Sequence, residues 1–168
     1  IVECPKPIIA EVNGVATAAG CQLIASCDLA ISSDNSRFAT PGVNIGLFCS
    51  TPMVALSRSI SKKDAMKMLL TGDMINAKEA KRISLINDYV SESDLEDSVM
   101  NLALKISQKS LKNIKIGKEA FYKQLYLDLS DAYEYTSAIM AENVLEDYAI
   151  EGINAFLEKR DPNWCDDQ

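Results

Sequence analysis

A run of small residues leads directly into an apolar segment near the start of this 168-residue chain. The letters GVATAAG occupy residues 14–20, and the uncharged amide Gln22 stands in the first turn that follows. A helix that begins near Ala18 leaves its first amide N–H groups without internal partners, which favours negative charge there. The amides of Ala19 and Gly20 are therefore candidate donors to a carbonyl oxygen that gains charge during a reaction. The alternative is that small side chains only allow a helix to pack closely on a sheet.

Several kinds of chemistry are excluded by residue type. The chain has no histidine, which excludes Ser-His-Asp and Cys-His catalysis and His-ligated metals within it. Its five cysteines include no CxxC spacing, so we predict no disulfide framework, no metal site and a reducing compartment. Cys49 could be a nucleophile toward a thioester or a small buried hydrophobe. The absence of a neighbouring base that could activate the thiol favours the buried thiol.

Charge and hydropathy limit the partners. The net charge is −7, so the chain has no basic surplus to neutralise phosphates, and we predict no nucleic-acid binding. The lysines between residues 105 and 123 indicate a solvated helix face. The longest uncharged run, residues 38–57, contains prolines and glycines, and we predict no membrane span.

Strands and helices alternate in the first part of the chain and must position these residues, and only helices are expected after that. We expect strands at residues 7–12, 29–32, 37–39 and 85–90, and helices at about 18–27, 51–60 and 62–70. Capping patterns begin at Ser61, Asn76 and Ser93, and from Ser93 to about Arg160 we expect only helices. This order predicts an α/β fold, a parallel sheet layered with helices, with a helical appendage that can bury apolar surface against a neighbouring subunit.

Four segments together resemble one family. They are KPIIAEVNGVATAAGCQLIASCDLAIS, SRFATPGVNIG, LTGDMINAKEAKRISLINDYV and EGINAFLEKRDPNW. In combination they are similar to the enoyl-CoA hydratase/isomerase, or crotonase, superfamily over nearly the whole chain. The resemblance implies a crotonase-like α/β fold, with the C-terminal part of the core at residues 1–92 and a helical trimerisation region at 93–168. The family's first strands and a second oxyanion-hole amide would lie upstream of these residues.

The resemblance also assigns roles within the candidate site. It places the oxyanion hole at the amide of Ala19, with Gly20 beside it. Active hydratases of the family use two glutamates to move protons, and their positions fall on Gln22 and Gly42. An amide does not exchange protons near neutral pH, and glycine has no side chain, so we expect hydratase activity to be weak or absent.

Substitute acids are scarce near these positions. Between Val12 and Lys63 the only carboxylates are Asp28 and Asp34. Asp28 lies at the far end of the expected helix from the small-residue loop, and Asp34 lies in a turn composition. We expect both to serve caps or turns rather than catalysis.

The family resemblance further implies a ligand and an assembly. It implies an acyl-CoA thioester as ligand, no permanently bound cofactor, homotrimers or hexamers, and a mitochondrial role in fatty-acid metabolism. Phe156 and Lys159 fall on positions that meet the adenosine phosphate end of CoA, although the same residues also suit an amphipathic helix end.

Two other function classes remain open from the sequence. One is a different crotonase chemistry on a CoA thioester, such as hydrolysis or decarboxylation. The other is a noncatalytic oligomeric scaffold joined through the helical region.

Overall fold

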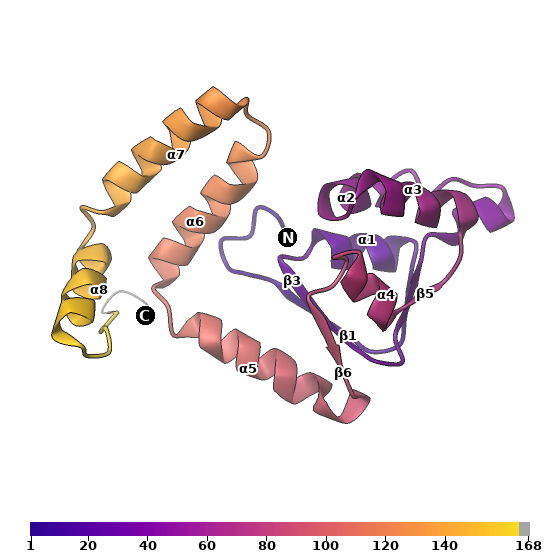
Figure 1. Cartoon of the computed structure of the whole chain (residues 1–168), viewed down its shortest axis with the longest axis horizontal. Helices are drawn as coiled ribbons and strands as arrows, with labels where there is room; N and C mark the ends of the chain where they lie inside the picture. The colour runs from indigo at the N-terminus through magenta and orange to yellow at the C-terminus, as the bar shows by residue number, and fades with distance from the viewer. Residues whose placement is uncertain (165–168) are drawn as a thin grey trace. The chain divides into compact units, whose positions relative to one another are not determined.

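A computed structural model describes residues 1–164 of the chain (Figure 1). The residues form two compact units. The core unit holds Ile1–Val2 and Ile8–Ala103, and the helical unit holds Glu3–Pro7 and the residues from Leu104 onward. The elements of the core unit are, in order, β1 (Ile9–Val12), β2 (Val15–Thr17), α1 (Ala19–Ser26), β3 (Leu29–Ser33), β4 (Arg37–Ala39), the 3-10 helix η1 (Pro41–Ile45), α2 (Pro52–Ser59), α3 (Lys62–Thr71), β5 (Ile75–Asn76), α4 (Ala77–Arg82), β6 (Asp88–Val90) and the 3-10 helix η2 (Glu92–Asp94).

Two small sheets organise the core unit. One has the order β1-β3-β6 and is wholly parallel, with Ile9 opposite Leu29 and Ile31 opposite Asp88. The other has the order β2-β4-β5, in which β2 and β4 run parallel and β5 runs antiparallel to β4. The predicted α/β fold is therefore present. The chain leaves the first sheet at β1, enters the second at β2 and returns to the first through α1, so this helix connects the two sheets.

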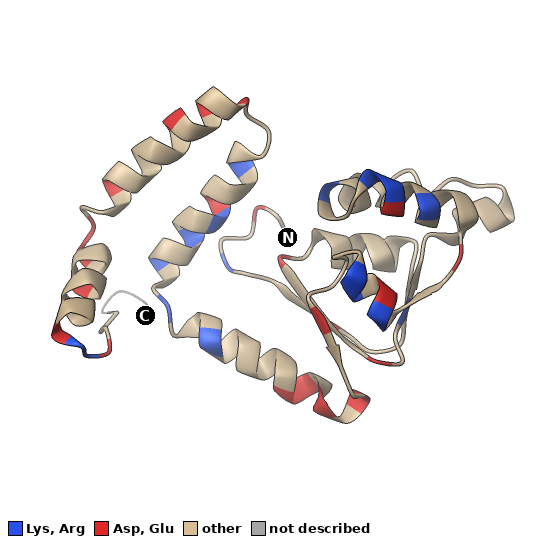
Figure 2. Cartoon of the chain, viewed as in Figure 1, with Lys and Arg blue, Asp and Glu red and all other residues tan. Residues whose placement is uncertain are grey.

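The core between these elements is apolar and closely packed. Phe38, Leu56 and Cys21 are fully buried and belong to one hydrophobic cluster, which removes their surface from water and stabilises the packed helices. Helix α1 contains no charged residue and is drawn wholly in tan in Figure 2. A helix without charges suits a position that is surrounded by other elements.

Two of the three predicted helix caps are confirmed. The Ser61 hydroxyl accepts the Asp64 N–H at 3.1 Å before α3, and the Asn76 side chain accepts the Glu79 N–H at 2.9 Å before α4. The prediction that Ser93 caps the next helix is wrong. Ser93 lies within η2, whose N-cap is Ser91, because the chain turns as soon as β6 ends.

The predicted strand at residues 85–90 is shorter than expected, since β6 begins only at Asp88. Leu85 and Ile86 are buried, which explains their apolar character without a strand. Asn87 accounts for the difference, because its side chain accepts the Ala30 N–H at 2.7 Å and its own N–H donates to the Ala30 carbonyl at 2.8 Å. The sequence also gave no indication of β2, which forms from the small-residue stretch itself.

Only helices follow η2 in the described part of the chain, as predicted. They are α5 (Leu95–Ser107), α6 (Leu111–Gln124), α7 (Leu129–Asn143) and α8 (Asp147–Glu158). The proposed domain boundary at residue 92 and the trimerisation role of 93–168 stay predictions, and residues 165–168 lie outside the described part. No helix within residues 1–164 has the length and apolar content needed to cross a membrane.

Candidate active site

The entry to α1 has a strained backbone. Ala18 adopts φ 47° and ψ −112°, a conformation that residues with a Cβ rarely take. Its N–H donates to the carbonyl of Ala39 at 3.0 Å, which fixes the loop to the end of β4. Strain of this kind persists only where the surroundings hold it, and it is concentrated at functional sites. The strained residue connects the small-residue loop to the segment that contains Gly42.

The first amides of α1 are the ones that the sequence singled out. The Gln22 N–H is satisfied by the Ala18 carbonyl at 3.0 Å, which leaves the preceding amides of the first turn. Within residues 1–164, the N–H groups of Ala19 and Gly20 have no acceptor. Ala19 is exposed and Gly20 half-buried, so both donors are accessible to a ligand. Two unpaired donors at a helix start can hold a carbonyl oxygen and stabilise charge that develops on it.

Packing alone does not explain the glycine at this place. A Cβ added to Gly20 would meet only the Ala16 Cβ, at 3.8 Å, which is an ordinary van der Waals contact. An alanine would therefore fit among the described residues. Close packing of the helix on the sheet therefore does not require a glycine at residue 20.

Gln22 is placed beside these donors but carries no proton-transfer chemistry. It lies in the first turn of α1 and is half-buried. Its carbonyl accepts the Ser26 hydroxyl at 2.8 Å, and its side-chain amide makes no hydrogen bond to another described residue. The side chain is thus available to orient a ligand oxygen or a water, but cannot exchange a proton near neutral pH.

Gly42 lies in η1 against a wall of atoms from its own loop. A Cβ at this position would stand 3.0 Å from the Cys49 Sγ, 3.1 Å from the Leu47 carbonyl oxygen and 3.2 Å from the Cys49 nitrogen. Two of these three atoms belong to the backbone and cannot swing away. Residue 42 therefore has no side chain, and even a methyl group there would require the Cys49 and Leu47 atoms to move by a few tenths of an ångström.

The carboxylate of Asp28 has a structural partner, and Asp34 lies in a turn, as predicted. Asp28 accepts the Ile8 N–H at 2.7 Å and so ties the start of β1 to the end of α1. Asp34 follows β3, where its N–H donates to the Val90 carbonyl at 2.8 Å. No group of three or more His, Cys, Asp or Glu side chains within residues 1–164 could hold a metal ion.

The buried thiols are unsuited to nucleophilic chemistry. Cys49 is 8% exposed and belongs to the core cluster, in agreement with the buried-thiol interpretation. Burial, with a smaller effect of the nearby Cys49, raises the pKa of the Cys21 thiol to about 12. Since the thiolate is the reactive form, Cys21 stays protonated and inert at neutral pH.

Two features of the site gave no signal in the sequence. One is the strained conformation of Ala18, because an alanine gives no warning of a positive φ. The other is Thr40, which is fully buried immediately before Pro41 and whose hydroxyl has no hydrogen-bond partner among the described residues. A buried hydroxyl without a partner is costly, which marks the end of β4 as an unusual place in the core.

The remaining candidates, Phe156 and Lys159, belong to the helical unit. Phe156 is 81% exposed on the last turn of α8, and Lys159 caps this helix in the left-handed conformation with φ 56°. An exposed aromatic ring next to a cation is compatible with an adenosine phosphate group and equally with an ordinary helix end.

Comparison with known proteins identifies the family. The family described as Enoyl-CoA hydratase/isomerase matches residues 1–167. The chain is 52% identical over 160 residues to enoyl-CoA hydratase domain-containing protein 3, mitochondrial, of Xenopus laevis, covering 95% of this chain and 54% of that protein. It is 34% identical over 158 residues to a short-chain-enoyl-CoA hydratase of Clostridium acetobutylicum, covering 92% of this chain and 60% of that protein. The chain thus spans about half the length of the curated relatives it matches.

Solved structures of enoyl-CoA hydratases and related proteins have the same fold as this chain. A crystal structure of enoyl-CoA hydratase from Mycobacterium smegmatis has a TM-score of 0.95 and 46% identity, covering 98% of this chain and 64% of that one. The crystal structure of human enoyl-CoA hydratase domain-containing protein 3 has a TM-score of 0.94 and 52% identity, covering 98% and 65%. The crotonase-like fold is confirmed, and the mitochondrial names of the first relatives agree with the expected compartment. The chain belongs to the enoyl-CoA hydratase/isomerase family.

Proposed function

We propose that this chain forms the thioester-binding part of a mitochondrial acyl-CoA-binding protein of fatty-acid metabolism, with weak or no hydratase activity. The thioester carbonyl accepts hydrogen bonds from the amides of Ala19 and Gly20, and Gln22 orients the bound group. The observation that carries the proposal is the pair of unpaired, accessible amides at the start of α1, held in place by the strained Ala18.

The proposal of weak or no hydratase activity rests on the absence of groups that could transfer protons. Hydration of an enoyl thioester requires one group that takes a proton from water and another that gives a proton to carbon. The positions that resemble the family's two glutamates hold Gln22 and Gly42, neither of which can do this. The wall of Leu47 and Cys49 atoms around Gly42 supports the view that this chain is built without the second acid.

The other end of the ligand involves the helical unit. We propose that Phe156 and Lys159 meet the adenine and phosphate groups of CoA, in a homotrimer or a hexamer, and that no cofactor is bound permanently. Lys159→Met would then weaken binding of CoA itself, measured by calorimetry, whereas Lys62→Met on α3 would leave it unchanged. Equal affinity for both variants would contradict this assignment.

The oxyanion hole can be tested with a pair of ligands rather than a variant. Butyryl-CoA and its thioether analogue S-butyl-CoA differ in the carbonyl that the two amides would bind. Because each neutral hydrogen bond contributes about 1 kcal/mol, the two bonds should make the thioester bind roughly thirtyfold more tightly in calorimetry. Its carbonyl stretch should also move to lower frequency in the infrared spectrum. Equal affinities with an unshifted carbonyl would overturn the oxyanion-hole assignment.

One alternative has an observation in its favour. Leu129, Tyr133 and Met140 on α7 are 67–76% exposed, which suits a protein whose main role is assembly. If no CoA ester binds in the calorimeter while the protein still assembles, the noncatalytic scaffold replaces the acyl-CoA-binding function.

A further inference from the structure

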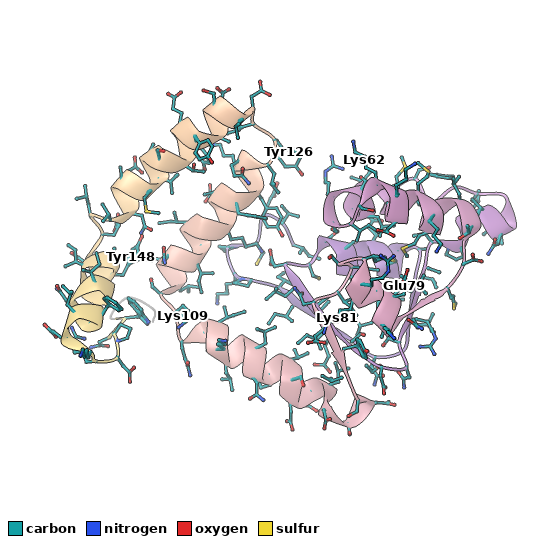
Figure 3. The ribbon with its side chains drawn as sticks, in the orientation of Figure 1. Lys62, Glu79, Lys81, Lys109, Tyr126 and Tyr148 are labelled. Carbon is teal, nitrogen blue, oxygen red and sulfur yellow. The ribbon has the colours of Figure 1, made fainter. Side chains whose placement is uncertain are left out.

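The helical unit contains a cavity that has no part in the site at α1. Its volume is about 490 Å³, within the range of roughly 300–1,000 Å³ that is usual for small-molecule sites. Figure 3 labels Lys109, from the connection between α5 and α6, and Tyr148, from α8, which both line it. The lining includes Lys109, Ile114, Tyr148, Ile153, Phe156 and Trp164.

One wall is the ring of Trp164, which is held from two sides. Its Nε1–H donates to the Gln108 carbonyl at 2.9 Å. Its ring edge lies against Gly152 on α8, where an added Cβ would be 3.2 Å from the Cη2 and 3.5 Å from the Cζ3. The absence of a side chain at residue 152 lets the ring edge approach the helix closely. The wall is therefore a fixed part of the cavity.

Two buried hydroxyl groups of the lining are paired within the protein itself. Tyr148 is 5% exposed, and its hydroxyl accepts the Asn143 Nδ2–H at 3.0 Å. The buried hydroxyl of Ser110 accepts the Asn113 N–H at 3.3 Å. What remains for a ligand is apolar surface, from side chains such as Ile114 and Ile153 and from the indole ring. An apolar molecule gains free energy by leaving water for this surface.

The lining carries charge of one sign. Among residues 1–164, Lys109 is the only charged residue of the lining, and no carboxylate of these residues lines the cavity. Lys109 is exposed at the connection before α6, so its ammonium group can reach an acidic group at the cavity mouth while the cavity holds an apolar chain. A cationic ligand would find no counter-charge in this lining.

We propose that this cavity binds a small amphipathic carboxylate of the medium-chain fatty-acid class. The apolar chain packs against Tyr148, Ile153 and Trp164, and the carboxylate pairs with Lys109. The site does not include the amides at Ala19 and Gly20, but Phe156, proposed above to meet the adenine group of CoA, also lines the cavity.

The only tryptophan of the chain, Trp164, is a built-in reporter for this site. Decanoate titrated below its micelle concentration should give a saturable blue shift of the tryptophan emission, because the ring loses contact with water. Decylammonium, which has the same chain and the opposite charge, should bind at least about tenfold more weakly. Equal responses to the two amphiphiles would overturn the assignment of Lys109, and no response to either would overturn the site.

Two pairs of variants separate binding from loss of structure. Lys109→Met should weaken decanoate binding about tenfold, whereas Lys105→Met, on the exposed end of α5 outside the lining, should not. Ala149→Phe should fill the cavity and abolish the shift, whereas Ile150→Phe, on the outer face of α8, should keep it. Far-ultraviolet circular dichroism shows whether each variant is folded. If the emission instead depends on protein concentration and ignores decanoate, a second copy covers the cavity and the proposal is wrong.

Discussion

The wall around Gly42 makes a strong prediction at the scale of single residues. Gly42→Ala should destabilise the protein by about 1–3 kcal/mol, because the new methyl group meets a thiol and two backbone atoms at 3.0–3.2 Å. The matched control is Gly117→Ala in α6, where a Cβ meets nothing within 4 Å. That change should stabilise by about 0.5–1 kcal/mol, since glycine costs conformational entropy inside a helix. Denaturant unfolding measures the change in the free energy of unfolding for both variants. If both variants were stabilised, or both destabilised, the result would contradict the account.

A glutamate introduced at residue 22 alone should not restore hydratase activity. Gln22→Glu is nearly isosteric and places its charge in the first turn of α1, where the helix dipole favours it by roughly 0.3–1 kcal/mol. We expect this variant to fold normally and still not hydrate an enoyl-CoA, because residue 42 supplies no second proton carrier. Ordinary turnover by Gln22→Glu would show that another group carries the second proton.

The raised pKa of Cys21 predicts its chemical behaviour. With the pKa at about 12, only about one thiol in 10⁴ is ionised at pH 8. Iodoacetamide should therefore label the partly exposed Cys4 in the native protein and leave Cys21 unlabelled until urea unfolds the chain. Peptide mapping by mass spectrometry distinguishes the two. Rapid native labelling of Cys21 would mean that the core around α1 opens readily.

The sequence predicted the chemistry of the site better than its geometry. The identities of Gln22 and Gly42 can be read from the chain, and so can the absence of nearby acids. The strain at Ala18 could not be foreseen, because it arises from the hydrogen bond to Ala39, 21 positions further along the chain. The wall around Gly42 likewise comes from the fold of its own loop, which depends on where Leu47 and Cys49 pack.

At the scale of elements, the turn after α8 should be sensitive to acid. Arg160 contacts both carboxylate oxygens of Glu151, at 2.6 and 2.9 Å, and the Asn163 N–H donates to one of them at 2.7 Å. The hydrogen bonds from Arg160 and then from Asn163 lower the pKa of Glu151 from 4.5 to about 2. A lowered pKa in the folded state means that this tie stabilises fully above pH 4.5 and is lost as the pH falls toward 2.

Trp164 follows this turn directly and can report the loss. Its emission should change between about pH 4.5 and 2, and in Glu151→Gln it should already be changed at pH 7. Glu158→Gln is the matched control, because Glu158 contacts Arg160 at 2.6 Å but does not bind Asn163. Identical acid titrations of Glu151→Gln and the unchanged protein would contradict the prediction.

Elements with local signals were the ones that the sequence predicted well. The caps at Ser61 and Asn76 depend on residues three positions away, and both form. The start of α5 was wrong because the 3-10 helix η2 precedes it, and the length of β6 was inexact because Asn87 pairs with the distant Ala30. Strand β2 was missed for a related reason, since its pairing with Arg37–Ala39 comes from a distant segment.

At the scale of the whole molecule, the exposed apolar face of α7 should hold subunits together. Leu129, Tyr133 and Met140 lie at helical spacing on one face and are each more than half exposed. Leu129→Lys combined with Met140→Lys should convert the proposed trimer to monomers in analytical ultracentrifugation. Ala138→Lys, on the opposite face of the helix, should leave the mass unchanged. A monomeric unchanged protein, or a trimer that survives the double change, would contradict this assignment.

The central claim is that the protein binds a CoA thioester but has no pair of groups to hydrate it. The most direct measurement is turnover of a short enoyl-CoA, such as crotonyl-CoA, followed by the absorbance of its conjugated thioester, with binding of the same ligand measured in parallel. We predict saturable binding with a rate no higher than that of a sample without protein. Turnover of about 1 s⁻¹ or more, in the range of ordinary enzymes, would contradict the account.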